Sequence, residues 1–98
     1  MYPSDTDKQL IRAIASLQNE KEIENFFRDL LTTSEIEEFS SRFAVATLLW
    51  TTKKSYLEIA KEINTSTTTV TRVAAWLYKE PYQGYANVLT KLYGKSLR

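Results

Sequence analysis

The amino-acid sequence predicts an all-α protein of about six helices that includes a helix-turn-helix. Apolar residues recur at helical spacing along most of its 98 residues. Only two glycines and two prolines interrupt the chain, which favours long helices with short connections. Hydrophobic residues make up 43% of the total, a share typical of a globular protein. We therefore expect one domain over residues 1–98.

Two amphipathic helices are predicted at the start of the chain. The first covers about Asp5 to Leu17, and Asn19 can cap the second by accepting a hydrogen bond from a backbone N–H of its first turn. Their apolar stripes are Leu10, Ile11, Ile14 and Leu17, and Ile23, Phe26, Phe27, Leu30 and Leu31. Such stripes usually form a core, but a monomer of this size has few interior positions for four Phe, two Trp and six Tyr. We therefore expect the helices of residues 1–52 to form the interface of a homodimer.

The third and the sixth helices are predicted from their ends. Ser34 and Glu37 fit the S-x-x-E capping box, so a helix is expected to begin there and to continue to about Trp50. Its inward-facing residues are predicted to be Ile36, Phe39, Phe43, Ala46, Leu49 and Trp50. A further helix is expected within residues 81–94, with Pro81 in its first turn and Gly94 as its C-terminal cap.

The helix-turn-helix is predicted at residues 55–78. Two short helices, Tyr56–Ile63 and Thr67–Tyr78, would cross where the small Ala60 allows close contact. Their shared core is predicted to consist of Ile59, Ile63, Val70 and Val73. Asn64 suits the left-handed backbone that the turn requires, and Thr65 or Ser66 can cap the second helix.

The exposed face of the second short helix is rich in hydroxyl groups. Threonine is a mediocre helix former, so four threonines within residues 67–71 indicate a role beyond helix formation. Hydroxyls can bond phosphates and base edges, and threonine methyls can touch thymine methyls. The face therefore predicts binding to double-stranded DNA, with nearby lysines contacting phosphate. The predicted DNA-binding residues are Lys53, Lys54, Tyr56, Lys61, Ser66, Thr67, Thr68, Thr69 and Thr71.

The charges divide unevenly along the chain. Residues 1–40 carry nine acidic and four basic side chains, whereas residues 41–98 carry nine basic and three acidic ones. This division favours a phosphate-binding surface in the second half, although chance clustering on solvated helix faces gives the same pattern.

Several functional classes are not supported. Without Cys or His, a disulfide and a Cys/His zinc site are excluded, and most nucleophile–base pairs are absent. The pairs Glu35/Glu38 and Glu58/Glu62 have the spacing of solvated helix faces. We expect no enzyme, no metal and no cofactor. We find no signal peptide and no membrane span, so a cytoplasmic protein is predicted.

One set of residues recurs in a known order over about residues 25–81: Leu30-Leu31-Thr32, Glu37, Arg42, Leu48-Leu49 and Thr69-Val70-Thr71-Arg72. In these residues the sequence resembles the Trp repressor superfamily, most closely its Trp repressor-like branch. It implies an intertwined all-helical homodimer whose two reading heads address half-sites about one helical turn apart. It also implies a sequence-specific transcriptional regulator that represses by occupying an operator. Two other classes remain open: an all-helical protein–protein interaction module without DNA binding, and a domain of a transposase or sigma-like factor.

The resemblance also implies where an effector would bind. In the family a tryptophan corepressor lies between two arginines that match Arg42 and Arg72, and Thr32 matches a threonine that helps enclose it. Val73 and Trp76 stand where the family has a glycine and a serine, and they would occupy room that the ligand needs. We expect Arg72 to stack on Trp76, which would then substitute for the corepressor. The alternative is that Trp76 only fills the core.

Overall fold

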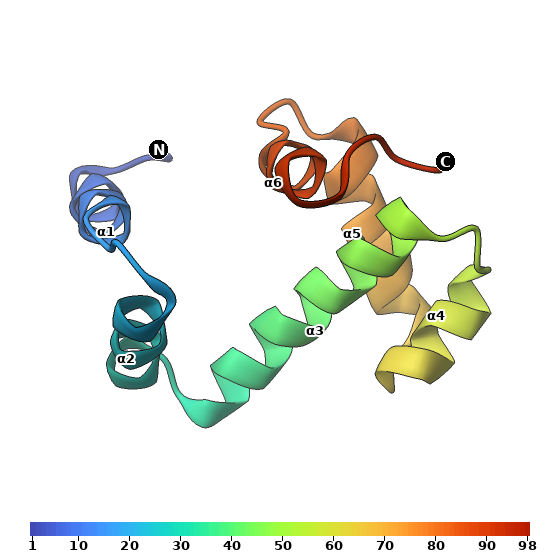
Figure 1. Ribbon diagram of the computed structural model, residues 1–98, viewed down its shortest axis with the longest axis horizontal. Helices are drawn as coiled ribbons and strands as arrows, with labels where there is room; N and C mark the ends of the chain where they lie inside the picture. The colour runs from blue at the N-terminus through green and yellow to red at the C-terminus, as the bar shows by residue number, and fades with distance from the viewer. The chain divides into compact units, whose positions relative to one another are not determined.

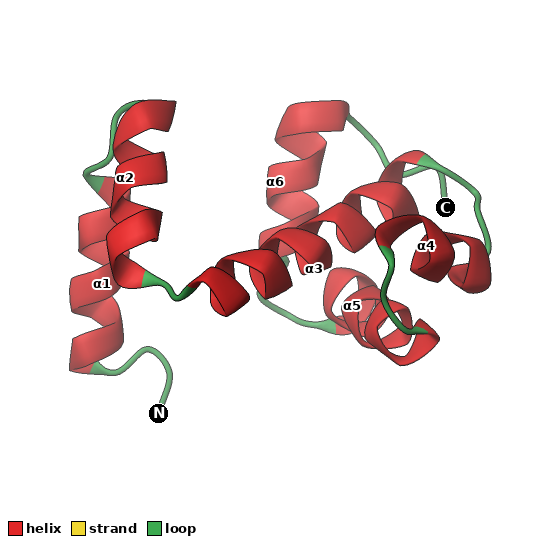
Figure 2. Cartoon of the chain, turned by 90° about the horizontal axis from the view of Figure 1, so that it is seen from below, coloured by secondary structure: helices red, strands yellow, loops and turns green.

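The computed structural model describes residues 1–98 and contains six helices and no strand, as the sequence predicts (Figure 1). The helices are α1 (Asp5–Ala15), α2 (Glu20–Leu30), α3 (Thr33–Thr51), α4 (Tyr56–Ile63), α5 (Thr67–Lys79) and α6 (Gly84–Tyr93). Figure 2 shows the loops that join them. The chain divides into two compact units, Met1–Ile36 and Glu37–Arg98, and the boundary falls within α3. None of the helices is long and apolar enough to cross a membrane.

The N-terminal unit consists of α1, α2 and the first turn of α3. Asn19 caps α2 as predicted, because its side chain accepts a hydrogen bond from the Glu22 backbone N–H at 2.9 Å. Neither α1 nor α2 contains a buried side chain. Apolar residues that are left exposed on them include Leu10, Ile11, Ile14, Ile23, Phe27 and Leu30. The unit has no closed core of its own, and one domain over residues 1–98 stays a prediction.

The cap of α3 lies two residues before the predicted position. Thr32, not Ser34, is the capping residue: its hydroxyl accepts from the Glu35 N–H at 3.1 Å, and the Glu35 carboxylate accepts from the Thr32 N–H at 2.9 Å. The predicted Ser34/Glu37 box is therefore wrong, because Thr32 and Glu35 fit the same T-x-x-E pattern two residues earlier. The Thr32 N–H and, to a smaller extent, its hydroxyl lower the pKa of Glu35.

The C-terminal unit packs the second half of α3 against α4, α5 and α6. Its core contains Val45, Ala46, Leu49, Trp50, Ile59, Ala60, Val70, Val73, Ala74, Leu77 and Leu89. The predicted inward positions Ala46, Leu49 and Trp50 are confirmed, whereas Phe39 is 44% exposed. Phe39 lies in the first half of α3, before the first core residue of the helix, Val45.

The segment between α5 and α6 also corrects the prediction. Pro81 does not start a helix, since α6 begins only at Gly84. Glu80 is extended (φ −77°, ψ 140°), as expected for the residue before a proline, and this ends α5 at Lys79. Gln83 then adopts a left-handed backbone with φ 58°. Gly94 ends α6 with φ 81°, which confirms its predicted role as the C-terminal cap.

Candidate nucleic-acid interface

Helices α4 and α5 form the predicted helix-turn-helix, and residues 56–79 are called the reading head below. Asn64 has the left-handed backbone that was predicted for the turn, with φ 62° and ψ 52°. The Thr65 N–H donates to the Ala60 carbonyl at 2.9 Å, which closes the turn. Ile59 and Ala60 of α4 are buried together with Val70 and Val73 of α5, so the predicted shared core is confirmed at these positions. Ile63 is half-buried against it.

The first turn of α5 presents the hydroxyl groups that were predicted to meet DNA. Ser66 is the capping residue: its hydroxyl oxygen accepts from the Thr69 N–H at 3.1 Å and lies 3.1 Å from the Thr69 hydroxyl oxygen. The Thr71 hydroxyl donates to the Thr67 carbonyl at 2.9 Å. The hydroxyls of Thr67 and Thr68 have no partner within the chain and are exposed. The hydroxyl oxygens of this face can still accept hydrogen bonds, and those of Thr67 and Thr68 can also donate them.

The electrostatics of this helix end favour an anion. The first turn of α5 contains no acidic residue, whereas the first turns of α1, α2, α3 and α4 each contain at least one. Free backbone N–H groups and the helix dipole place partial positive charge there. A phosphate at this end would meet no competing carboxylate within the turn.

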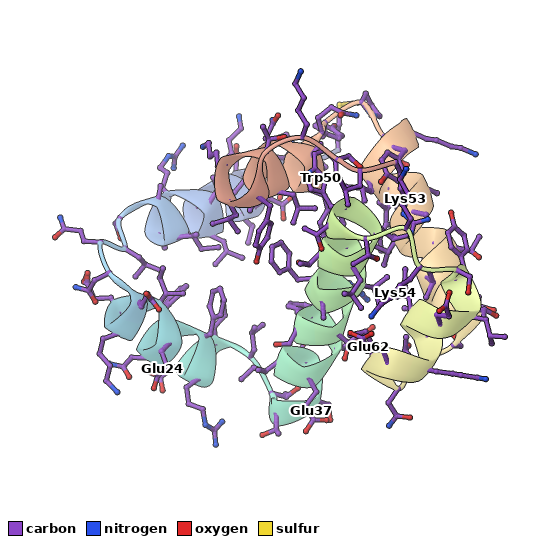
Figure 3. The ribbon with its side chains drawn as sticks, turned by 45° about the vertical axis from the view of Figure 1, so that its right-hand side comes forward. Glu24, Glu37, Trp50, Lys53, Lys54 and Glu62 are labelled. Atoms are coloured by element: carbon purple, nitrogen blue, oxygen red, sulfur yellow. The ribbon has the colours of Figure 1, made fainter.

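The lysines predicted to contact phosphate differ in their surroundings. Lys53 and Lys61 are exposed and form no ion pair. Lys54 pairs with Glu62 of α4, and both side chains lie beside each other in Figure 3. Phosphate would therefore have to compete with Glu62 for Lys54. Tyr56 is 40% exposed at the start of α4.

A capping box also fixes the start of α4, and it was not predicted from the sequence. The Ser55 hydroxyl accepts from the Glu58 N–H at 3.1 Å, and the Glu58 carboxylate accepts from the Ser55 N–H at 2.9 Å. The Ser55 N–H and, to a smaller extent, its hydroxyl lower the pKa of Glu58. The S-x-x-E spacing of these residues is the signal that could have shown it.

Arg42 of α3 lies among aromatic side chains next to the reading head. Its guanidinium carbon is 5.5 Å from the centre of the Phe39 ring and 5.7 Å from that of the Trp76 ring. The Glu38 carboxylate accepts from the same guanidinium at 2.5 Å. Arg42 therefore links α3 to α5 through the Trp76 ring. An open hollow of about 440 Å³ lies beside Trp76, with Phe43, Tyr85 and Val88 in its wall.

Comparison with known proteins identifies the family. Residues 6–93 match the model of the family described as Trp repressor protein. The chain belongs to the Trp repressor family. A TrpR-like protein from Eubacterium eligens is 36% identical, with a TM-score of 0.81 over 92% of this chain and 91% of that one. A candidate Trp repressor from Staphylococcus aureus is 30% identical, with a TM-score of 0.84 over 95% of this chain and 91% of that one. No curated protein matches the sequence.

Membership of the Trp repressor family gives this chain the fold of a DNA-binding regulator. The Trp repressor-like branch within the family stays a prediction. The predicted stacking of Arg72 on Trp76 is wrong, because Arg72 is exposed and makes no ring contact or ion pair. Arg42 contacts Trp76 instead, since the indole is half-buried against the core on the side of α3. Phe39 and Glu38 were not predicted as partners of Arg42, although their i,i+3 and i,i+4 spacing to it could have indicated the contacts.

Two further residues that were predicted to line an effector site, Val73 and Thr32, have roles in the fold. Val73 is fully buried in the core of the reading head. The Thr32 hydroxyl belongs to the cap of α3 in the N-terminal unit. Of the predicted effector set, the structure brings together Arg42 and Trp76.

Proposed function

We propose that this chain is a sequence-specific DNA-binding transcriptional regulator that acts in the cytoplasm as a homodimer and represses by occupying an operator. The observation that carries the proposal is the hydroxyl-rich face of α5, which is exposed while the opposite face of the helix closes the helix-turn-helix core. The Thr67 and Thr68 hydroxyls are exposed, without a hydrogen-bond partner in the chain, at the helix end that favours phosphate. This role requires no catalytic group and no metal.

A second copy of the chain is the proposed occupant of the exposed apolar faces of α1 and α2. Large side chains such as Ile14 and Phe27 are 43% and 38% exposed, which leaves apolar surface in water. Covering such stripes with a symmetric partner would supply the core that the N-terminal unit lacks. A two-fold dimer would then present two reading heads to two half-sites of an operator.

Binding to duplex DNA over a range of salt concentrations tests the proposed function. If Lys53, Lys54 and Lys61 of both subunits contact phosphate, about six contacts are made, and affinity should fall about a thousandfold between about 50 and 200 mM salt. A gel shift or a fluorescence titration at each concentration measures this. Absence of binding at the lowest salt would favour the alternative of a protein–protein interaction module.

We further propose that Trp76 takes the place of a corepressor, so that DNA binding needs no free tryptophan. Support comes from Arg42, whose guanidinium already lies over the Trp76 ring and is paired with Glu38. A cation–π contact of this kind contributes about 0.5–1 kcal/mol at an exposed site. Arg72 of α5 is exposed and makes no ring contact.

Titration calorimetry with L-tryptophan checks this second proposal. We expect no heat of binding in the micromolar range and an operator affinity that is the same with and without the amino acid. Micromolar binding of L-tryptophan would show that a ligand site is open and would refute the role given to Trp76.

A further inference from the structure

Residues 94–98 follow α6 and return to the end of α3 (Figure 1). The Trp50 indole N–H donates to the Gly94 carbonyl at 2.7 Å, and the Leu97 N–H donates to the Trp50 carbonyl at 2.9 Å. Trp50 is thus held by this segment through both its side chain and its backbone. The last carbonyls of a helix have no hydrogen-bond donor within the helix, and the segment supplies a donor to one of those of α3.

Arg98 extends these contacts to the connection between α3 and α4. Its Nε donates to the Leu49 carbonyl at 2.7 Å, and its Nη2 donates to the Lys54 carbonyl. One guanidinium therefore bridges the last turn of α3 and residues 52–55. A positive charge at the C-terminal end of a helix is also favourable to the helix dipole.

The same segment reaches α5 through Tyr78. The Tyr78 hydroxyl lies 3.1 Å from the Ser96 hydroxyl oxygen and 3.4 Å from the Leu49 carbonyl oxygen. Its ring stacks on that of Trp50, with centroids 6.3 Å apart and planes at 10°. Residues 94–98 therefore contact α3, the linker of residues 52–55 before α4, and α5 of the reading head itself.

We propose that residues 94–98 act as a strap that sets the orientation of the reading head and of Lys53 and Lys54 for DNA. Arg98 is the principal positioning residue, because its one guanidinium joins the Leu49 carbonyl of α3 to the Lys54 carbonyl of the linker. The DNA-binding part of this inference rests on the function proposed above. The claim that residues 94–98 fix the linker does not rest on that function, and it can be measured on the free protein.

Arg98→Ala compared with Lys95→Ala is the matched test. Both changes remove one positive charge from the same segment, but Lys95 forms no hydrogen bond or ion pair. Leu97→Pro compared with Leu97→Ala is a second pair without any charge change. Proline removes the N–H that donates to Trp50, and alanine keeps it.

Two measurements are made on each variant. In the free protein, hydrogen exchange of the Trp50 indole N–H and of the Lys54 and Ser55 amides should be about tenfold faster in Arg98→Ala, as expected for the loss of charged hydrogen bonds. Affinity for one fixed DNA duplex at fixed salt should fall about tenfold, against about threefold or less in Lys95→Ala. Leu97→Pro should behave like Arg98→Ala, and Leu97→Ala like the wild type.

The results separate this inference from the proposed function. Unchanged exchange in both Arg98→Ala and Leu97→Pro overturns the strap. Faster exchange with a DNA affinity equal to that of Lys95→Ala shows that the strap does not act on the reading head, and it too overturns the inference. If the wild-type protein binds no duplex even at low salt, the proposed function is wrong, and the exchange rates alone then decide whether residues 94–98 fix the linker.

Discussion

Thr68→Asp combined with Thr69→Asp should abolish DNA binding while the protein remains folded. Thr68 is exposed on the proposed DNA face, and Thr69 is half-buried next to the capping Ser66. Two carboxylates at this helix end would face phosphates, and like charges brought together in an interface cost several kcal/mol. We expect affinity to fall about a hundredfold or more, measured by fluorescence titration with circular dichroism as the test of folding.

A double variant with the same change of net charge is the control. Gln9→Glu and Gln18→Glu replace exposed side chains of the N-terminal unit by acids of nearly equal size. This protein should lose about tenfold or less, since the added charges lie outside the reading head. If both double variants lose the same affinity, net charge and not the α5 face determines binding.

Ile59→Ala should destabilise the protein by about 2–5 kcal/mol, because it empties the centre of the helix-turn-helix core. Ile59 is fully buried on α4, and its neighbours in the core include Val70 and Val73 of α5. Surrounding side chains relax only partly into such a space, so a cavity remains. Chemical denaturation followed by circular dichroism measures the free energy of unfolding.

Leu57→Ala provides the matched comparison on the same helix. Leu57 is 56% exposed, so its truncation removes little buried surface and should cost about 0.5 kcal/mol or less. Similar losses of stability in the two variants would contradict the packing of α4 on α5. We also expect the DNA affinity of Ile59→Ala to remain within about threefold of the wild type when it is measured at a temperature where the protein is still folded.

The helix-turn-helix could be predicted from sequence because its determinants are local. Asn64 tolerates a left-handed backbone, Ser66 offers a capping oxygen, and the apolar spacing on either side places one face of each helix inward. Each of these signals lies within a few residues of the feature that it specifies. The structure bears out all three.

Helix ends were less predictable where two signals competed. Thr32/Glu35 and Ser34/Glu37 both fit a capping box, and the sequence alone does not rank them. Pro81 is compatible with a first turn of a helix, but the extended Glu80 and the left-handed Gln83 place it in a loop instead.

Contacts between distant segments could not be predicted at all. Arg42 was expected near an effector, but its contact with Trp76 depends on how α3 crosses α5. The bonds of Arg98 to Leu49 and Lys54 join residues more than forty positions apart and leave no periodic pattern. Such contacts arise from packing geometry, which a single sequence does not encode in a form that local rules can read.

Selection of bound duplexes from a random DNA pool tests whether α5 reads DNA. We expect the wild-type protein to enrich one motif with two-fold symmetry, whose halves are separated by about one helical turn. We expect the Thr68→Asp/Thr69→Asp protein to enrich nothing. A pool that stays random with the wild type, or a motif that the double variant enriches equally well, would contradict the reading of DNA by α5.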